Sequence, residues 1–278
     1  MIIVQENIEY AVIGHPIGHT MSPYIHTRLF KLQNKTVNYS KLDISPDALK
    51  DSFSSLKTLK GFNVTIPHKQ SIIQFIDKLD SSALKYGAVN CVDTKDGITY
   101  GYNTDAYGFI KSLESNNVKL EGKVLICGSG GVARTFAKES IGCGCDVYIA
   151  AINNESEYLK SELDFTSIEY SQINGGFDII INATPVGMYP KCDNAILSEN
   201  QLAGCKVLFD AVYNPCKTKL LQIAEKSGIT AIGGMSMLVW QAVKAHEIWY
   251  DAKFDLDDIN NLIADANMAL GEIFGEKE

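Results

Sequence analysis

The sequence has no long hydrophobic run and little positive charge. No stretch of about eighteen apolar residues occurs, so we expect no transmembrane helix. The 25 Lys and Arg residues are outnumbered by 33 Asp and Glu residues, which gives a formal charge of −8. Nucleic acids and anionic membranes require clustered basic residues, so we expect neither as a partner. Within residues 1–6, no basic segment precedes the short apolar one, as a secretory signal peptide would require. We therefore expect a cytoplasmic protein.

The cysteines do not suggest a disulfide framework. There are seven of them, an odd number, and they are scattered over 278 residues. This pattern favours free thiols in a reducing compartment. Cys143 and Cys145 form a C-x-C pattern, but no second pair of potential ligands lies close in sequence. We therefore expect no metal site.

The composition predicts a soluble globular chain with a substantial core. Hydrophobic residues make up 46% and charged residues 21% of the sequence, and the length suits one large domain or two ordinary ones. Predicted strands and helices alternate along the N-terminal half, which indicates an α/β fold with mostly parallel strands. In open α/β sheets, ligands bind at the carboxyl ends of the strands.

Residues 61–69 read GFNVTIPHK and predict a half-buried strand that stops at Pro67. Apolar and polar residues alternate in this strand. The apolar ones are Phe62, Val64 and Ile66, and the polar ones are Asn63 and Thr65. Lys69 would place an ammonium group beside the strand end. Such a row could bind a polyhydroxylated small molecule and supply a proton donor, whereas the alternative is an ordinary strand followed by a solvated lysine.

Hydroxyl groups precede the first predicted helix. Pro23 suits its first turn, with Ser22 as the N-cap. Thr20 lies two residues before Ser22 in an extended segment, so both hydroxyls could project to one side. Capping explains Ser22 but leaves Thr20 unexplained.

Further polar residues lie near the ends of later predicted strands in this half. Asn90 lies in a predicted strand over 87–92, which follows a predicted helix over 70–79. A buried amide requires a hydrogen-bond partner, so Asn90 either satisfies a turn or contacts a ligand. The segment 103–105, Asn-Thr-Asp, adds three polar groups before a predicted helix over 106–115.

A glycine-rich loop opens the second half of the chain. Residues 123–127 predict a buried strand, and a helical pattern follows the loop to about residue 141. The loop has the spacing G-x-G-G-x-A, a variant of the dinucleotide-binding fingerprint. Its glycines would allow a pyrophosphate to approach the backbone at a helix N-terminus. The predicted cofactor-binding residues here are Gly128, Ser129, Gly130, Gly131, Val132 and Ala133.

The next strand does not decide between NAD and NADP. The strand over 146–149 leads into residues 150–154, Ala-Ala-Ile-Asn-Asn. The end of this strand is the position that distinguishes NAD from NADP. It has neither an acidic residue to bind a ribose diol nor an arginine to bind a 2′-phosphate.

Later segments complete an α/β second domain and then two helices. Strands are predicted over 177–182, 207–213 and 230–232, and helices over 218–227, 235–250 and 256–274. We expect the last two helices to pack on the N-terminal unit. This gives a discontinuous domain of residues 1–106 plus 237–278 and a Rossmann-type, doubly wound domain of residues 107–236, with Gln241 near a cleft between them. His246 is expected to be structural.

Seven motifs resemble those of the shikimate dehydrogenase family and occur in the same order and spacing as in that family. They cover about residues 10 to 250. They are HTMSP at 19–23, NVTIPHK at 63–69, GAVN at 87–90, GYNTD at 101–105, NATPVGM at 182–188, YNP at 213–215 and MLVWQ at 237–241. The resemblance implies an N-terminal substrate domain, a dinucleotide-binding domain, and reversible hydride transfer between shikimate and a nicotinamide, usually that of NADP, in aromatic amino-acid biosynthesis.

The resemblance also implies roles for individual residues. Lys69 and Asp105 would be the catalytic pair, and Thr20 and Ser22 would hold the substrate carboxylate. The implied substrate-binding set is Thr20, Ser22, Thr65, Asn90, Asp105, Tyr213 and Gln241. Outside the glycine loop, the residues expected near the cofactor are Thr184, Ala211 and Gly234.

Two departures from the family pattern leave alternatives open. Ala151, Ile152 and Asn153 stand where the family commonly has Asn-Arg-Thr, so the arginine that pairs with the 2′-phosphate is missing, unless Lys160 or an amide replaces it. Cys91 replaces the usual Thr after Asn90. An NAD-preferring quinate or shikimate dehydrogenase therefore remains an alternative, as does a non-catalytic nucleotide-binding regulator, although the latter would not need the catalytic pair.

The proton chemistry favours Lys69 as a donor. A free lysine is almost wholly protonated at pH 7, and a nearby carboxylate stabilises that charge. We therefore expect Lys69 to donate a proton during ketone reduction while Asp105 orients it. The expected partners are small molecules only, and the expected state is a monomer or a homodimer.

Overall fold

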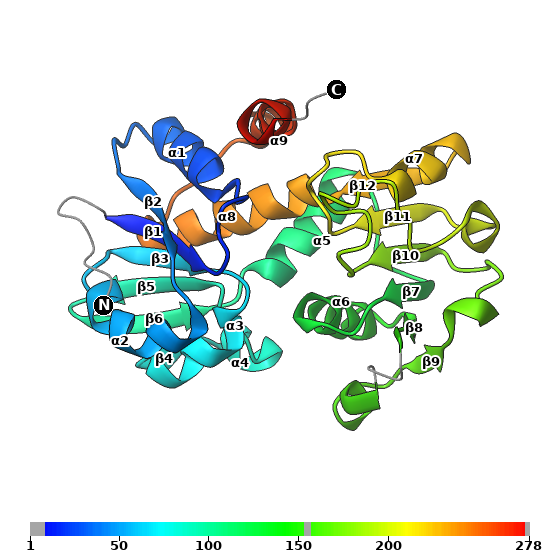
Figure 1. Ribbon diagram of the computed structural model, residues 1–278, viewed down its shortest axis with the longest axis horizontal. Helices are drawn as coiled ribbons and strands as arrows, with labels where there is room; N and C mark the ends of the chain where they lie inside the picture. Colours follow the sequence, from blue (N-terminus) through cyan, green and yellow to red (C-terminus); the bar gives the residue numbers. More distant parts are fainter. Residues whose placement is uncertain (1–8, 153–156, 276–278) are drawn as a thin grey trace. The chain divides into compact units, whose positions relative to one another are not determined.

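A computed structural model describes residues 9–152 and 157–275 (Figure 1). It divides into one unit of Met1–Thr104 with Gln241–Glu278 and a second unit of Asp105–Trp240. The boundaries predicted from the sequence are 106/107 and 236/237. The N-terminal residues 1–6 and the residues Asn153 and Asn154, on which sequence predictions were made, lie outside the described residues. Within the described ranges, no helix has the length and hydrophobicity needed to cross a membrane.

The first unit contains a six-stranded sheet in the order β2-β1-β3-β5-β6-β4. Strand β1 pairs in parallel with β2 and β3, and β4 pairs in parallel with β6, whereas β5 runs antiparallel to both of its neighbours. The strands are β1 (Tyr10–Gly14), β2 (Tyr39–Asp43), β3 (Gly61–Val64), β4 (Lys78–Leu79), β5 (Cys91–Lys95) and β6 (Ile98–Tyr102). The β5–β6 connection contains Asp96 and Gly97, both with positive φ, as a tight hairpin requires.

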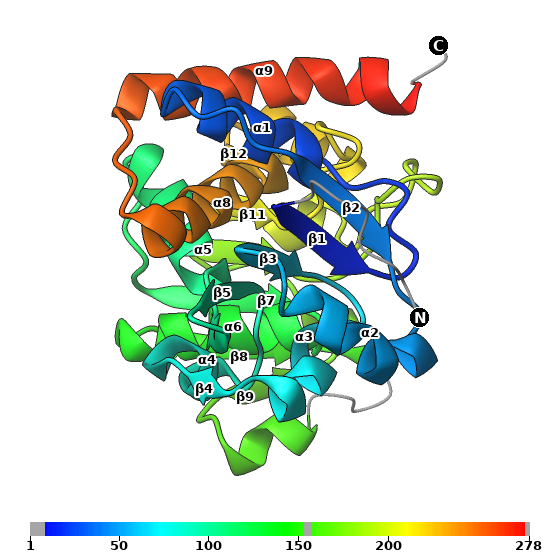
Figure 2. The same cartoon turned by 90° about the vertical axis from the view of Figure 1, so that its left-hand side faces the viewer.

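Helices cover both faces of this sheet. The described helical segments are α1 (Ser22–Leu32), η1 (Pro46–Ala48), α2 (Leu49–Leu56), α3 (His68–Ser71), η2 (Ile72–Phe75), α4 (Ser81–Tyr86), the later part of α8 (Gly234–Tyr250) and α9 (Leu256–Phe274). Helix α9 lies alongside α1 (Figure 2). On α8, Trp249 donates from Nε1 to the Val92 carbonyl oxygen at 2.9 Å. A Cβ added to Gly61 would lie 2.4 Å from that Nε1, so β3 carries glycine where the indole contacts it.

Three local predictions in this unit are wrong. Strand β3 ends at Val64 and is buried throughout, because it lies inside the sheet between β1 and β5, and Ile66 is 73% exposed. The region 70–79 forms two short helical segments and β4 instead of one helix. Residues 87–90 precede β5 instead of forming a strand, since Gly87 ends α4 with a left-handed φ of 62°.

The second unit contains a six-stranded parallel sheet in the order β12-β11-β10-β7-β8-β9. Its strands are β7 (Lys123–Cys127), β8 (Asp146–Ala150), β9 (Thr166–Ile168), β10 (Ile179–Asn182), β11 (Val207–Asp210) and β12 (Thr230–Gly233). Its described helical segments are α5 (Asp105–Ser115), α6 (Gly131–Gly142), η4 (Glu157–Ser161), η5 (Tyr170–Gln172), η6 (Glu199–Leu202), α7 (Lys219–Lys226) and the start of α8. This strand order is that of a doubly wound Rossmann-type sheet.

Alternate residues of the central strands supply two cores in the second unit. Val124 and Ile126 of β7 join the cluster on one face, and Leu125 and Cys127 join the cluster on the other. The first cluster contains three aromatic rings from three elements, with centroids 4.4 to 5.6 Å apart. They are Phe109, Phe136 and Phe209. Burial on both faces explains why β7 is a continuous apolar run.

A buried polar cluster lies between α1 and α8 in the first unit. His26 Nδ1 and His246 Nε2 are 2.9 Å apart, and His246 Nδ1 is hydrogen-bonded to the Tyr250 hydroxyl. The His26 ring stacks on Tyr39 with a centroid distance of 4.3 Å. Burial lowers the pKa of His26 from 6.5 to about 3, and burial together with the neighbouring His26 lowers the pKa of His246 well below 6.5. Both imidazoles are therefore neutral at pH 7, which agrees with a structural role for His246.

This cluster predicts a loss of stability on mild acidification. The unfolded chain protonates these histidines below about pH 6.5, whereas the folded chain keeps His26 neutral down to about pH 3. The free energy of unfolding therefore falls as the pH drops through this window. His26 alone accounts for a loss of about 2 kcal/mol between pH 7.5 and pH 5. Urea unfolding at the two pH values measures this loss.

A double variant, His26→Phe with His246→Leu, tests the origin of the effect. It should lose much less stability than the wild type between the two pH values, while the control His19→Gln, at an exposed histidine, should behave like the wild type. An equal loss in the double variant and the wild type would show that other groups are responsible.

Candidate active site

The register of the second sheet brings the predicted cofactor residues to one edge. Across the sheet, Ala150, Cys127, Asn182, Asp210 and Gly233 pair in register as the last residues of β8, β7, β10, β11 and β12. The glycine loop, Thr184, Ala211 and Gly234 each follow directly or within two residues of one of these ends. The residues that the sequence assigned to a cofactor therefore share the carboxyl edge, where ligands bind in such sheets.

The glycine loop combines a tight turn with open space. Gly128 has φ of 111°, and a Cβ there would lie 3.0 Å from Thr184 Cγ2, so glycine is required by conformation and packing. At Gly130 and Gly131, an added Cβ would meet no protein atom within 4 Å. The first turn of α6 contains no acidic residue, and the first amides of a helix have no intrahelical acceptor. This loop can hold a phosphate group at the α6 N-terminus, as its sequence predicts.

The loops after β10 and β11 are tied together by a buried polar cluster. Asp210 Oδ1 accepts from Asn182 Nδ2 at 2.9 Å, and Asp210 Oδ2 accepts from the Thr218 hydroxyl at 2.6 Å. Burial raises the pKa of Asp210, although these hydrogen bonds oppose the rise. Asn182 Oδ1 in turn accepts from both the amide and the hydroxyl of Thr184. Thr184 is therefore held in a fixed position at the sheet edge.

Gly234 and Ala211 approach each other closely by their backbones. A Cβ at Gly234 would lie 2.4 Å from the Ala211 carbonyl oxygen, so only glycine fits there. Tyr213 follows in the same loop, and burial raises the pKa of its phenol. After β8, the described residues Ala151 and Ile152 carry no charge, and Ile152 is 60% exposed. Lys160 lies in η4, and its part in cofactor binding stays a prediction.

The first sheet likewise gathers polar residues at one edge. Strands β1, β3 and β6 end at this edge, and the antiparallel β5 begins there, since Asn63 pairs with Cys91 and Cys91 with Tyr102. Thr65 follows β3, and Asn90 precedes β5. Thr104 lies two residues after the end of β6. The antiparallel direction of β5 is what places Asn90 at the same edge as the strand ends.

Thr20 and Ser22 face each other at the start of α1. The Thr20 hydroxyl accepts from the Ser22 amide at 3.2 Å and donates to the Ser22 hydroxyl at 3.1 Å. The helix begins at Ser22, with Met21 at the N-cap position and no side-chain cap from Met21. The expected capping role of Ser22 is therefore wrong, and Thr20 satisfies this helix amide instead. Their two hydroxyls form a pair, as the sequence suggested.

Asn90 and Gln241 meet through a residue that sequence reasoning passed over. Asn90 Oδ1 accepts from the Thr104 amide at 2.7 Å, and Asn90 Nδ2 donates to the Thr104 hydroxyl at 3.0 Å. The same hydroxyl lies 3.4 Å from Gln241 Oε1. Asn90, Gln241 and Thr104 are 3%, 8% and 1% exposed. Thr104 was noted only as one of three polar groups, and its position between two other polar residues was its only signal.

Asn63, like Thr104, is a polar residue to which the sequence assigned no role. Its Oδ1 accepts from the Tyr39 hydroxyl at 2.8 Å, and its Nδ2 donates to the Asn90 carbonyl oxygen at 3.3 Å. Its amide is thus bonded inside the sheet, and its burial at 5% exposure explains why β3 has no solvated polar face.

Lys69 is positioned by its backbone and by its neighbour His68. Its carbonyl oxygen accepts from the Val89 amide at 2.7 Å, one residue before Asn90. His68 is buried and hydrogen-bonded through Nε2 to the Ile44 carbonyl oxygen at 2.6 Å. Lys69 thus lies in α3 of the first unit, and Asp105 is the buried first residue of α5 in the second unit. Their predicted pairing stays a prediction.

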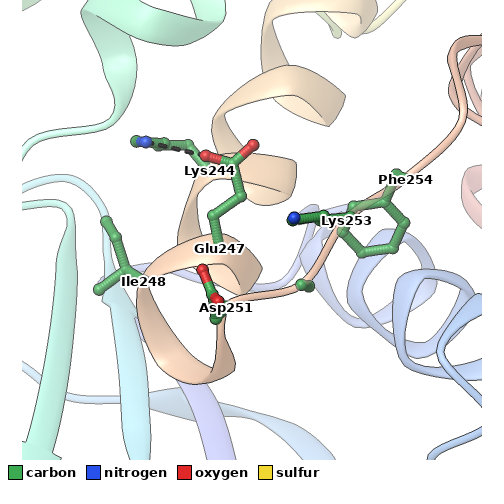
Figure 3. A pocket seen from close by; sticks show the side chains of 7 residues that line it. Lys244, Glu247, Ile248, Asp251, Lys253 and Phe254 are labelled. Carbon is green, nitrogen blue, oxygen red and sulfur yellow. Dashed lines mark hydrogen bonds and ion pairs between the residues drawn. The ribbon is translucent and has the colours of Figure 1, made fainter.

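A hollow of about 550 Å³ lies elsewhere in the first unit, at the end of α8 (Figure 3). Its lining residues are Lys244, Glu247, Ile248, Asp251, Ala252, Lys253 and Phe254. Lys244 and Glu247 form an ion pair of 2.8 Å with each other. The hollow contains none of the predicted site residues. Within the part of the chain that the structure describes, no group of three or more His, Cys, Asp or Glu residues is arranged to hold a metal ion.

Comparisons with known proteins agree across both units. A family model described as the shikimate dehydrogenase substrate binding domain matches residues 12–92. A curated NADP(+)-dependent shikimate dehydrogenase of Caldanaerobacter subterraneus subsp. tengcongensis is 38% identical over 261 residues, 89% of this chain and 93% of the relative.

Two solved structures show the same fold. Shikimate 5-dehydrogenase of Thermus thermophilus, in complex with NADP(H) and shikimate, is 26% identical with a TM-score of 0.87, over 93% of this chain and 99% of that one. The Listeria monocytogenes enzyme, in complex with shikimate and NAD, is 29% identical with a TM-score of 0.80, over 94% and 98% of the two chains. With this identity and coverage, the chain belongs to the shikimate dehydrogenase family.

Proposed function

We propose that this protein reversibly reduces 3-dehydroshikimate to shikimate with NADP(H) as the hydride donor. The observation that carries the proposal is the extent of the similarity, because the 261 aligned residues cover 89% of the chain and so include parts of both units. The substrate and the cofactor are inferred from the relatives, a shikimate dehydrogenase (NADP(+)) and a structure in complex with NADP(H) and shikimate. The residues of this chain supply the groups that bind the substrate and transfer the proton.

The first unit is proposed to bind the substrate. The matched range 12–92 contains Thr20, Ser22, Thr65, Lys69 and Asn90. Hydroxyl and amide groups complement a polyhydroxylated carboxylate, since they donate to carboxylate oxygens and both donate to and accept from hydroxyls. In this proposal Thr20 and Ser22 hold the carboxylate. Asn90, Thr65, Tyr213 and Gln241 contact the ring substituents or the carboxylate.

The second unit is proposed to bind the dinucleotide. The open space at Gly130 and Gly131 and the first amides of α6, which have no intrahelical acceptor, fit a pyrophosphate. Thr184, Ala211 and Gly234 follow neighbouring strand ends and are proposed to lie beside the nicotinamide. When bound, the nicotinamide supplies the hydride, and the protein orients it and supplies the proton.

Proton transfer is proposed to involve Lys69 and Asp105. Reduction of a ketone leaves an alkoxide that must gain a proton, and a lysine ammonium can donate it and stabilise the developing negative charge. The backbone contacts of Lys69 and the anchoring of His68 fix the helix turn that carries the ammonium. Asp105 is proposed to orient the lysine and a substrate hydroxyl.

NAD is a second candidate cofactor. The uncharged Ala151 and Ile152 follow β8, where a 2′-phosphate would require a cation. The Listeria monocytogenes structure contains NAD together with shikimate. The oligomeric state, monomer or homodimer, stays a prediction.

A steady-state comparison of shikimate and quinate, each with NADP and NAD, tests the proposal. We expect the highest kcat/KM with shikimate and NADP. A higher value with NAD would replace the cofactor in the proposal, and a higher value with quinate would replace the substrate. No turnover in any combination would favour a nucleotide-binding regulator.

Substitution of the proposed proton donor should slow catalysis without unfolding the protein. Lys69→Ala should lower kcat by about 10²–10⁴-fold, the usual contribution of general acid–base catalysis. The control Lys78→Ala removes an exposed ammonium of the same unit and should leave kcat unchanged. A kcat for Lys69→Ala within about threefold of the wild type would contradict the role of Lys69.

The open space at the glycine loop predicts a selective loss of cofactor affinity. Gly130 has φ of −69° and ψ of −176°, which alanine can adopt, and its added methyl group meets no protein atom. Gly130→Ala should therefore change the free energy of unfolding by no more than about 1 kcal/mol. It should raise the Kd for NADP(H) about tenfold or more, because the methyl group occupies the space of the pyrophosphate.

Gly142→Ala is the matched control. Gly142 ends the same helix and also has nothing within 4 Å of an added Cβ, but it lies far along α6 from the loop. Its Kd should equal that of the wild type. If Gly130→Ala binds NADP(H) as tightly as Gly142→Ala, the pyrophosphate does not lie at this loop.

A further inference from the structure

Thr104 is almost fully buried and contacts two residues that the proposed function assigns to the substrate. Its exposure is 1%, and both its amide and its hydroxyl are within hydrogen-bond distance of the Asn90 side chain. Its hydroxyl also reaches Gln241, which lies 137 residues away in the sequence. All three residues belong to the first unit. Thr104 thus provides a hydrogen-bonded contact between α8 and this edge of the first sheet.

The backbone of Asn90 is fixed independently of Thr104. The Asn90 amide donates to the Tyr102 carbonyl oxygen at 3.0 Å, and its own carbonyl oxygen accepts from the Val64 amide at 2.9 Å. Asn63 Nδ2 donates to the same carbonyl oxygen. The main chain is therefore held by β3 and β6, so that the rotation of the side-chain amide is the remaining degree of freedom.

Thr104 determines that rotation. A backbone amide can only donate, so the 2.7 Å contact requires Oδ1 of Asn90, and not Nδ2, to face the Thr104 amide. Nδ2 then donates to the Thr104 hydroxyl oxygen at 3.0 Å. A rotated amide would bring two donors together at the Thr104 amide and lose this bond. One orientation of Asn90 is thereby selected.

The same hydroxyl extends the selection to Gln241. The Thr104 hydroxyl lies 3.2 Å from Asn90 Oδ1 and 3.4 Å from Gln241 Oε1, and its single proton can be directed to either oxygen. Because Asn90 Oδ1 already accepts from the Thr104 amide, direction of the proton to Gln241 Oε1 gives each of the two oxygens one donor. The oxygen of Gln241 then faces Thr104, and its Nε2 lies on the opposite side of the amide group. Asn90 directs one N–H of Nδ2 to the Thr104 hydroxyl, so its second N–H and the Nε2 group of Gln241 are the donors that face elsewhere.

We infer that Thr104 is a positioning residue that sets the donor direction of Asn90 and Gln241 for recognition of substrate oxygens. This inference rests on the proposed function, because it assigns a purpose to two proposed substrate contacts. Thr104 acts through these amides and needs no contact with the substrate. Removal of its hydroxyl leaves Asn90 Nδ2 without this acceptor and leaves Gln241 without this donor.

Thr104→Val tests the contribution of the hydroxyl, since valine keeps the branched shape and the backbone amide that faces Asn90 Oδ1, and it removes the hydroxyl that contacts Asn90 Nδ2 and Gln241. The Kd and KM for shikimate should rise about tenfold or more, as expected when buried hydrogen-bonding groups lose a partner. The change in kcat should be smaller, and the Kd for NADP(H) should not change. Thr104→Ser keeps the hydroxyl and should restore most of the affinity.

Thr99→Val is the matched control for a loss of stability. Thr99 is 0% exposed, and its hydroxyl donates to Asp77 Oδ2 and accepts from the Asp77 amide, away from the proposed substrate residues. The same substitution there should lower the free energy of unfolding and leave KM unchanged. Equal KM values for Thr99→Val and Thr104→Val would overturn the inference.

A double-mutant cycle with Asn90→Ala tests whether Thr104 acts through Asn90. In the Asn90→Ala background, Thr104→Val should change the Kd for shikimate much less than it does in the wild type. A full, additive effect in that background would overturn the role through Asn90.

Shikimate binding by calorimetry, with and without NADP⁺, separates the inference from the proposed function. A wild type that binds shikimate without turning it over contradicts the proposed function, and the Kd values of the variants still decide the inference. A wild type that turns over shikimate while Thr104→Val keeps wild-type Kd and KM overturns the inference alone. A wild type that neither binds nor converts shikimate overturns both.

Discussion

Strand register is the physical constraint on which both groups of candidate residues depend. In the second sheet, in-register parallel pairing aligns the last residues of five strands, and so brings the loops after them to the same edge. In the first sheet, the reversed direction of β5 brings Asn90 to the edge where β3 and β6 end. A shift of one residue in either sheet would turn these side chains to the opposite face.

Each unit satisfies its buried polar groups at the sheet edge by a similar arrangement. In the second unit, Asp210 is bonded to Asn182 and Thr218, and Thr184 completes the cluster. In the first unit, Asn90 is bonded to Thr104, whose hydroxyl reaches Gln241. Buried polar atoms cost free energy unless they are paired. Threonine serves both clusters because one hydroxyl can accept and donate at once.

The sequence predicted elements with strong periodicity well and elements set by tertiary contacts poorly. The strand over 123–127 and the helix over 256–274 are confirmed at both ends. The helix predicted over 70–79 is wrong because His68 is hydrogen-bonded to Ile44 and residues 78–79 pair with β6 as β4. Neither contact produces a periodic pattern of apolar residues in the sequence. The family motifs named most of the candidate residues, but spacing could not show that Thr104 meets Gln241, 137 residues later. The compartment and the oligomeric state stay predictions.

Helix α8 belongs to both units, since residues 234–240 cluster with the second and residues 241–250 with the first. The two tryptophans of the sequence, Trp240 and Trp249, are both buried on this helix, one in each unit. Intrinsic fluorescence therefore carries one signal from each unit. Because a continuous helix loses its hydrogen bonds cooperatively, melting of either unit would shorten the helix available to the other. The two fluorescence signals should consequently change together during unfolding, as in a single cooperative transition.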